Sequence, residues 1–272
     1  MIERSIPLTG EMIPVIGLGT WQSFDVSPSA DLDPLKQVLW QMSNAGGKLV
    51  DSSPMYGRSE EIIGLLTKGA ETDQFFYGTK VWTQGREEGI RQMENSFRKF
   101  RRSVIDLMQV HNLVDWKIHL KTLRQWKEDG RIRYIGVTHY TDSMHTELSR
   151  IIRSEKIDFV QFNYSITDRN AERLLLPTAF DHGVATLINR PFGEGRLFNK
   201  VRGKELPSWA NEYGIKSWSE FFLKFIVSNP AVTCVIPATS NPAHAKDNFN
   251  AAPDSLPDQS FRNKMIELVE KL

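Results

Sequence analysis

The sequence has a single cysteine, Cys234, so an intrachain disulfide is excluded. This scarcity fits a reducing compartment. Cys234 lies in the apolar run 232–236, and we interpret its thiol as core packing rather than as a nucleophile. Residues 1–10 contain no apolar run of signal-peptide length, and no stretch approaches the roughly 18 apolar residues of a membrane span. We therefore expect a cytoplasmic protein that does not enter a membrane.

The chain also has little net charge, since 34 Lys and Arg residues face 33 Asp and Glu residues and leave a formal charge of +1. This balance argues against nucleic acid or an anionic membrane as the main partner. The six histidines show no HExxH-like spacing and no second cysteine is present, so we expect no metal site. Because no linker or low-complexity tract divides the chain, we expect one domain over residues 1–272.

Short apolar runs alternate with amphipathic helical segments along the whole chain. The runs are rich in β-branched and aromatic residues and apolar on both faces, which is typical of buried parallel strands. Apolar residues recur at helical spacing in 90–100, 116–123 and 144–152, and further helices are expected over 169–182 and 218–228. The predicted strands cover residues 13–17, 48–51, 75–80, 105–110, 134–137, 159–163, 184–189 and 233–236.

Eight strands separated by helices predict an α/β fold, the closed (β/α)₈ TIM barrel. An open doubly wound sheet is the alternative, but it usually has a glycine-rich dinucleotide loop after its first strand. The segment Gly17-Leu18-Gly19-Thr20 does not complete that loop, which favours the barrel. We also expect an N-terminal β-hairpin over 5–15, a C-terminal outer helix over 261–272 and a long irregular loop over 191–214.

Polar residues stand where three of the predicted strands end. Asp51 ends the second strand, Lys80 ends the third, His111 follows the fourth, and Tyr56 lies five residues beyond Asp51. In a parallel barrel these positions face the active-site mouth. Each residue alone has an ordinary structural explanation, such as helix capping or surface charge. An acid, an amine, a phenol and an imidazole at neighbouring strand ends together predict a catalytic site.

These segments resemble the aldo-keto reductase superfamily, and the resemblance extends over nearly the whole chain. Ile16-Gly17-Leu18-Gly19-Thr20-Trp21 is similar to the family's first-strand signature, and Asp51-Ser52-Ser53-Pro54-Met55-Tyr56-Gly57 to its aspartate–tyrosine segment. Thr79-Lys80-Val81-Trp82 and Gln109-Val110-His111 look like its lysine and histidine strands. The resemblance implies an α/β barrel enzyme that reduces aldehyde or ketone carbonyls to alcohols with NADPH.

The resemblance also implies a role for each of the four residues. Nicotinamide would supply the hydride and Tyr56 the proton. A free tyrosine titrates near pH ~10, and we expect the Lys80 ammonium to lower that value. Asp51 would position Lys80 and keep it charged, and His111 would orient the carbonyl oxygen.

A dinucleotide site is implied by the same resemblance, with some departures. His139 stands where the family usually has asparagine, and Asn189 where it commonly has a tyrosine that stacks on nicotinamide. Ala238 and His244 replace a lysine and an arginine that hold the 2′-phosphate in many members. We keep NADP(H) as the preferred cofactor and NAD(H) as the alternative. The predicted cofactor-binding residues are Thr20, Trp21, Thr138, His139, Gln161, Asn189, Arg190, Pro191, Phe192, Thr239, Lys246, Asp247 and Asn248. Among them Arg190 is expected to meet a pyrophosphate charge because of its guanidinium geometry and not because of the motif.

The substrate is expected to be a small carbonyl compound between Trp21 and Trp82. The chain ends soon after its last predicted barrel helix, so the resemblance implies that it lacks the long C-terminal loop that shapes large-carbonyl pockets in some family members. This suggests an open site for small aldehydes, α-dicarbonyls or quinone-like carbonyls. Two other functions stay open: a cofactor-binding sensor or regulatory subunit on the same barrel, and a lyase that forms a Schiff base on Lys80. The sequence does not indicate the oligomeric state.

Overall fold

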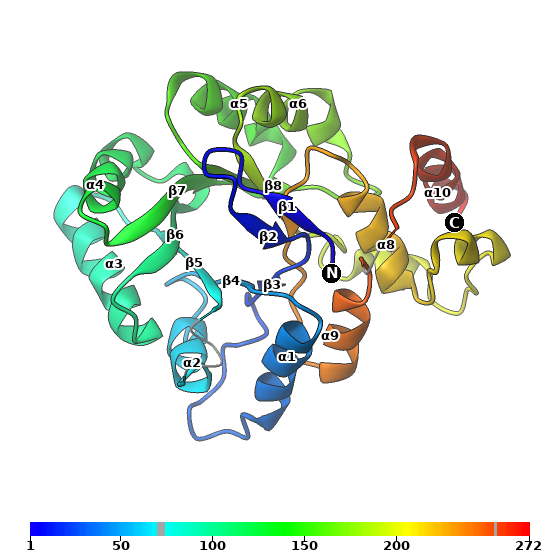
Figure 1. Cartoon of the computed structure of the whole chain (residues 1–272), viewed down its shortest axis with the longest axis horizontal. Helices are drawn as coiled ribbons and strands as arrows, with labels where there is room; N and C mark the ends of the chain where they lie inside the picture. Colours follow the sequence, from blue (N-terminus) through cyan, green and yellow to red (C-terminus); the bar gives the residue numbers. More distant parts are fainter. Residues whose placement is uncertain (70–73, 253–254) are drawn as a thin grey trace.

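The computed structural model describes residues 1–69, 74–252 and 255–272. Within these ranges eight parallel strands form one sheet in the order β10-β9-β8-β7-β6-β5-β4-β3. The backbone N–H of Gly17 donates to the carbonyl of Val235 at 2.9 Å, so the first strand meets the last and the ring is nearly closed (Figure 1). The predicted barrel is confirmed. Its strands are β3 (Leu18–Gly19), β4 (Leu49–Asp51), β5 (Phe76–Val81), β6 (Ile105–Val110), β7 (Ile132–Thr138), β8 (Phe159–Asn163), β9 (Ala185–Asn189) and β10 (Cys234–Val235).

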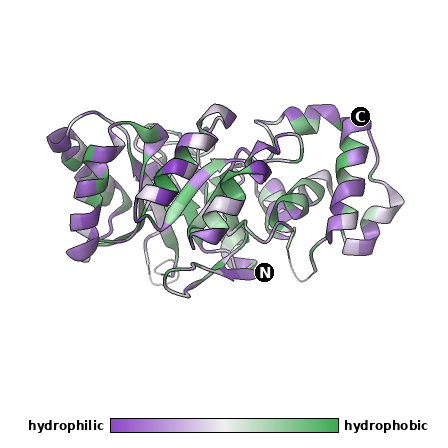
Figure 2. Cartoon of the chain, turned by 90° about the horizontal axis from the view of Figure 1, so that it is seen from above, coloured by the Kyte–Doolittle hydropathy of each residue, from purple (hydrophilic) through white to green (hydrophobic). Residues whose placement is uncertain are grey.

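Amphipathic helices surround the ring. In α5, for example, Leu148, Ile151 and Ile152 are buried while the opposite face is polar. Figure 2 shows the same division, with hydrophobic strands at the centre and hydrophilic turns outside. No helix in the described part of the chain is both long and apolar enough to span a bilayer. The helices around the ring are α1 (Asp33–Asn44), α2 (Ser59–Leu66), α3 (Arg86–Phe100), α4 (Trp116–Glu128), α5 (His145–Ser154), α6 (Leu175–Asp181), α8 (Trp218–Val227) and α9 (Pro242–Phe249).

Both additions to the barrel are present. The outer helix α10 (Gln259–Lys271) lies beside α8, beyond the ring (Figure 1). The hairpin pairs β1 (Glu3–Ser5) with β2 (Met12–Pro14), so the predicted first strand over 13–17 is wrong: its start belongs to the hairpin. Residues 13–18 are buried throughout, and burial therefore does not mark where one strand stops. The loop over 191–214, predicted as irregular, contains α7 (Arg196–Lys200) and a 3₁₀ helix (Ser208–Tyr213).

The side chains inside the barrel form two layers. Because successive strand residues face opposite sides, residues two apart share the interior. An apolar layer lies near the amino ends of the strands, and the hairpin's Ile6 and Ile13 pack against it. A polar layer follows further along: Asp51 and Gln109 lie two residues beyond Leu49 and Leu107, and Lys80 lies four residues beyond Phe76. The apolar layer comprises Leu49, Phe76, Leu107, Tyr134, Phe159, Ala185, Leu187, Cys234 and Ile236.

Candidate active site

The polar layer contains a buried ion pair. Lys80 Nζ lies 2.6 Å from Asp51 Oδ2 and donates to the carbonyl of Ser52 at 2.7 Å. The other carboxylate oxygen, Oδ1, accepts hydrogen bonds from Gln109 Nε2 and Gln161 Nε2, each at 3.0 Å. Both carboxylate oxygens are thus compensated by donors, which is the condition for keeping a charge away from water.

Tyr56 lies beside this pair, with Lys80 Nζ 4.9 Å from the centre of its ring. Burial raises the pKa of the Tyr56 phenol, and the charge of Lys80 lowers it without cancelling that effect. The expected net lowering of the pKa is therefore wrong, although the contribution of Lys80 has the expected direction. Burial would also lower the pKa of Lys80, but the Asp51 carboxylate outweighs it and the pKa is raised. At neutral pH the site presents a protonated phenol beside an ammonium group.

His111 completes the group. It begins the 3₁₀ turn His111–Leu113, directly after β6, and its side chain is 5% exposed. Its Nδ1 lies 3.0 Å from Ser53 Oγ, and its ring contacts that of Tyr56 edge-on, with centroids 5.7 Å apart. Burial, assisted by the charge of Lys80, lowers the pKa of His111 to about 2. The imidazole is therefore neutral, so it offers a hydrogen bond rather than a charge.

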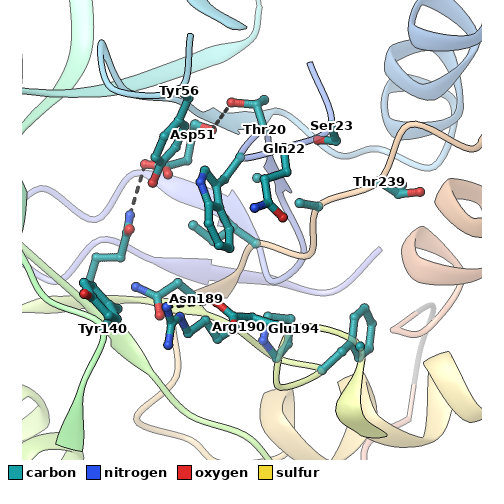
Figure 3. Close-up of a pocket in the computed structure, with 18 of the residues that line it drawn as sticks. Thr20, Gln22, Ser23, Asp51, Tyr56, Tyr140, Asn189, Arg190, Glu194 and Thr239 are labelled. Carbon is teal, nitrogen blue, oxygen red and sulfur yellow. Dashed lines mark hydrogen bonds and ion pairs between the residues drawn. The ribbon is translucent and has the colours of Figure 1, made fainter. Parts of the chain in front are cut away.

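The four predicted catalytic residues come together at the floor of a cavity of about 780 Å³, and all but the underlying Lys80 line it. A volume of this order, within roughly 300–1,000 Å³, suits a small-molecule site. Both predicted substrate residues, Trp21 and Trp82, also line the cavity. Figure 3 shows Tyr56 and Asp51 on one side of the cavity, opposite Tyr140, Asn189, Arg190 and Glu194.

The structure gathers only part of the predicted cofactor set. His139, Lys246, Asp247 and Asn248 do not line the cavity, and Asn248 is buried with its Oδ1 accepting a hydrogen bond from Ser219. Contacts of these residues with a cofactor stay a prediction. The members that line the cavity are Thr20, Trp21, Thr138, Gln161, Asn189, Arg190, Pro191, Phe192 and Thr239.

Two polar atoms in the cavity-lining residues are buried without a hydrogen-bond partner among the described residues, Asn189 Oδ1 and Ser23 Oγ. Asn189 Nδ2 donates to the carbonyl of His139 at 3.3 Å, which leaves Oδ1 as an acceptor. A buried acceptor without a donor is costly, so a ligand with N–H groups would be favoured there.

Sequence reasoning missed several residues of the site. Tyr140 lines the cavity, and the guanidinium of Arg190 lies 4.2 Å from the centre of its ring. Glu194 forms an ion pair with Arg190 at 2.9 Å, so the charge expected to meet a pyrophosphate already has a partner. Ser53, the partner of His111, was also missed. The position of Ser53 within the aspartate–tyrosine segment could have indicated that it belongs to the site. Nothing in the sequence indicates that Tyr140 and Glu194 both contact Arg190.

Comparison with known proteins gives concordant matches. The aldo/keto reductase family model matches residues 15–265. The 9,11-endoperoxide prostaglandin H2 reductase of Trypanosoma cruzi is 25% identical over 259 residues, covering 92% of this chain and 86% of the relative. The NADH-specific methylglyoxal reductase of Escherichia coli is 26% identical over 258 residues, with coverages of 82% and 78%. A solved aldo-keto reductase from Klebsiella pneumoniae, in complex with NADPH, has a TM-score of 0.82 at 22% identity, with coverages of 99% and 96%.

Proposed function

Because the chain belongs to the aldo/keto reductase family, we propose that it reduces aldehyde and ketone carbonyls to alcohols with Tyr56 as the general acid. The observation that carries this proposal is a protonated phenol in the wall of a cavity, beside a buried ammonium–carboxylate pair. We further propose NADPH as the preferred reductant. This preference is supported by the NADPH complex of the Klebsiella pneumoniae neighbour and opposed by the NADH-specific relative.

The residues of the cavity suit the nicotinamide end of such a cofactor. Asn189 Oδ1 is a buried acceptor without a partner in the part of the chain that the structure describes, and Thr138 and Gln161, which are register partners on β7 and β8, line the same cavity. Together they would hold a carboxamide, which offers two N–H donors and one carbonyl acceptor. When bound, the reduced nicotinamide supplies a hydride to the carbonyl carbon.

Tyr56 supplies the proton that the carbonyl oxygen takes up. The phenolate that remains is stabilised by the Lys80 ammonium, at about 1.4 kcal/mol for each unit by which its pKa falls. Asp51 and its two glutamine donors keep that ammonium charged and in place. Neutral His111 hydrogen-bonds the carbonyl oxygen and shares the negative charge that develops there. Solvent water then returns a proton to Tyr56.

Replacing Tyr56 with phenylalanine tests the assignment. We expect Tyr56→Phe to reduce carbonyls at least about 100-fold more slowly than the wild type, because the acid is gone. The dissociation constant for NADPH should be unchanged, since the ring stays in place. The assay follows the loss of NADPH absorbance with a panel of small aldehydes and dicarbonyls, and is repeated with NADH. Tyr213→Phe, outside the cavity, is the matched control. Turnover by Tyr56→Phe equal to that of the wild type would refute the assignment of Tyr56 as the general acid.

NADPH binding, the carbonyl panel and borohydride trapping separate the alternative functions. A sensor would bind NADPH tightly and consume none of it with any carbonyl. A Schiff-base lyase would be trapped covalently on Lys80 by borohydride. The structure disfavours the lyase, because Lys80 is fully buried and its amine is charged and donates to both Asp51 and Ser52. A Schiff base requires an uncharged amine that the substrate reaches.

A further inference from the structure

Ser53 touches two parts of the catalytic group at once. Its side chain is fully buried, and its Oγ lies 3.0 Å from His111 Nδ1. The same Oγ accepts a hydrogen bond from the backbone N–H of Met55 at 3.3 Å. Its carbonyl accepts a hydrogen bond from the N–H of Tyr56 at 3.0 Å. Ser53 therefore begins the turn that carries the proposed acid and also contacts the proposed orienting imidazole.

The hydrogen bonds of Ser53 fix the direction of the contact with His111. A serine hydroxyl has one hydrogen to donate and two lone pairs to accept with. One lone pair receives the N–H of Met55, and the only acceptor in contact with the hydroxyl among the described residues is His111 Nδ1. The opposite arrangement, in which Nδ1–H donates to Oγ, would leave the serine hydrogen buried without an acceptor.

A neutral imidazole carries its one hydrogen on the nitrogen that does not accept. If Nδ1 accepts from Ser53, the hydrogen resides on Nε2. Nε2 has no hydrogen-bond partner among the described residues, and His111 lines the cavity. The lowered pKa of His111 agrees with this arrangement, because a protonated ring would need Nδ1 to donate as well.

We propose that Ser53 is a positioning residue that holds His111 in the Nε2–H tautomer and so directs an N–H donor at the substrate carbonyl oxygen. The proposal rests on the proposed function for its consequence in catalysis. The tautomer itself does not depend on any activity. Ser53 also joins the two groups that act on the same oxygen, since its carbonyl anchors the turn of Tyr56 while its hydroxyl sets His111.

Nitrogen NMR of protein labelled with ¹⁵N-histidine tests the tautomer directly. The signals of His111 are assigned by their loss in His111→Gln. We expect the coupling pattern of a neutral ring protonated on Nε2 in the wild type, and a shift toward the Nδ1–H form in Ser53→Ala. A wild-type ring protonated on Nδ1 would overturn the proposal. Should Ser53→Ala not fold, Ser53→Cys, whose thiol is a weaker donor, takes its place, and a wild-type ring protonated on Nδ1 still overturns the proposal.

Kinetics provide the second readout. We expect Ser53→Ala to lower kcat/KM for carbonyl substrates by about 10- to 100-fold, the scale known for losing a group that orients a metal-bound histidine, with the NADPH dissociation constant unchanged. Ser149→Ala is the matched control, because Ser149 lies on α5 and its buried Oγ has no partner among the described residues. Wild-type kinetics and tautomer in Ser53→Ala would contradict the positioning role. A wild type that reduces no carbonyl would refute the proposed function and leave the NMR result standing.

Discussion

Replacing Lys80 with methionine tests how the barrel tolerates a charge at its centre. Methionine has a similar length but no charge and no hydrogen to donate. The substitution removes a fully buried ammonium from Asp51 Oδ2 at 2.6 Å and from the carbonyl of Ser52 at 2.7 Å. Asp51 Oδ1 keeps its two amide donors, Gln109 and Gln161. The variant therefore leaves a carboxylate that is half compensated.

Removing one member of a buried ion pair typically costs about 3–5 kcal/mol. Because Oδ1 stays hydrogen-bonded, we expect Lys80→Met to lose the smaller amount, about 3 kcal/mol of unfolding free energy. For a chain of this size, with about 2–4 °C per kcal/mol, the melting temperature should fall by roughly 6–12 °C. Adding Asp51→Asn removes the stranded charge and keeps an acceptor for the glutamines, so the double variant should regain about 2 kcal/mol.

Thermal and urea unfolding of the wild type, both single variants and the double variant form the assay. Arg86→Met is the control. Arg86 forms an ion pair with Glu87 at 2.9 Å in which both side chains are exposed, so its loss should change the free energy of unfolding little. A Lys80→Met variant as stable as the wild type would show that the buried ammonium contributes no stability. A further loss of stability when Asp51→Asn is added to Lys80→Met would show that the unpaired Asp51 carboxylate does not cause the destabilisation.

Three further predictions follow from other contacts. His111 has a pKa of about 2, below its ordinary 6.5, so kcat/KM should show no inflection near pH 6.5. The contribution of neutral His111 to the free energy of unfolding is complete above pH 6.5 and is lost as the pH falls. At pH ~5 the free energy of unfolding should be lower by about 2 kcal/mol, and His111→Asn should abolish this pH dependence. Arg262 donates to Tyr164 Oη at 2.9 Å and to Glu172 at 2.6 Å, so Arg262→Met should cost about 2–4 kcal/mol in urea unfolding and expose α10 to protease. A Cβ on Gly64 would lie 1.9 Å from the carbonyl oxygen of Lys99, so Gly64→Ala should separate α2 from α3 and lower stability by about 1–3 kcal/mol in thermal unfolding.

Each of these three has a clear contrary result. An inflection near pH 6.5 that disappears in His111→Asn would show that the ring titrates in the folded protein. Unchanged proteolysis of α10 in Arg262→Met would show that apolar packing alone holds that helix. A Gly64→Ala variant of wild-type stability would show that the two helices separate without cost.

The barrel was predictable from sequence because its strands are buried on both faces and are bounded by polar residues. The expected strands over 105–110 and 159–163 agree with β6 and β8 residue for residue. The exception lies at the start of the ring, where one buried run serves both the hairpin and the first strand. Ile13 packs inside the barrel from β2, whereas Leu18 belongs to β3. Hydrophobicity indicates only that a residue is buried, and residues of the hairpin and of the first barrel strand are equally buried.

The loops of the site were less predictable because their conformations are not those that the residues prefer. Arg190 and Glu194 both have positive φ, 52° and 58°, although neither is glycine. These backbone positions accompany the ion pair between the two side chains and the contact of Arg190 with Tyr140. The backbone preferences of these residues do not predict such a turn. From the sequence alone, Arg190 is therefore predicted to be free to bind a phosphate.

The strand residues of the site followed a simpler physical rule. Asp51 ends an apolar strand, and Gln109 and Gln161 lie within two others. A polar side chain inside a barrel is costly unless it is hydrogen-bonded. These residues lie on alternate strands, β4, β6 and β8, and the hydrogen bonds of Gln109 and Gln161 to Asp51 Oδ1 bring them together beside Lys80. Gly136 belongs to the same level, because a Cβ there would lie 3.3 Å from the Gln109 side chain. Polar residues on alternate apolar strands of a barrel therefore predict a hydrogen-bonded network inside it, and the group that this network keeps charged indicates where the catalytic chemistry takes place.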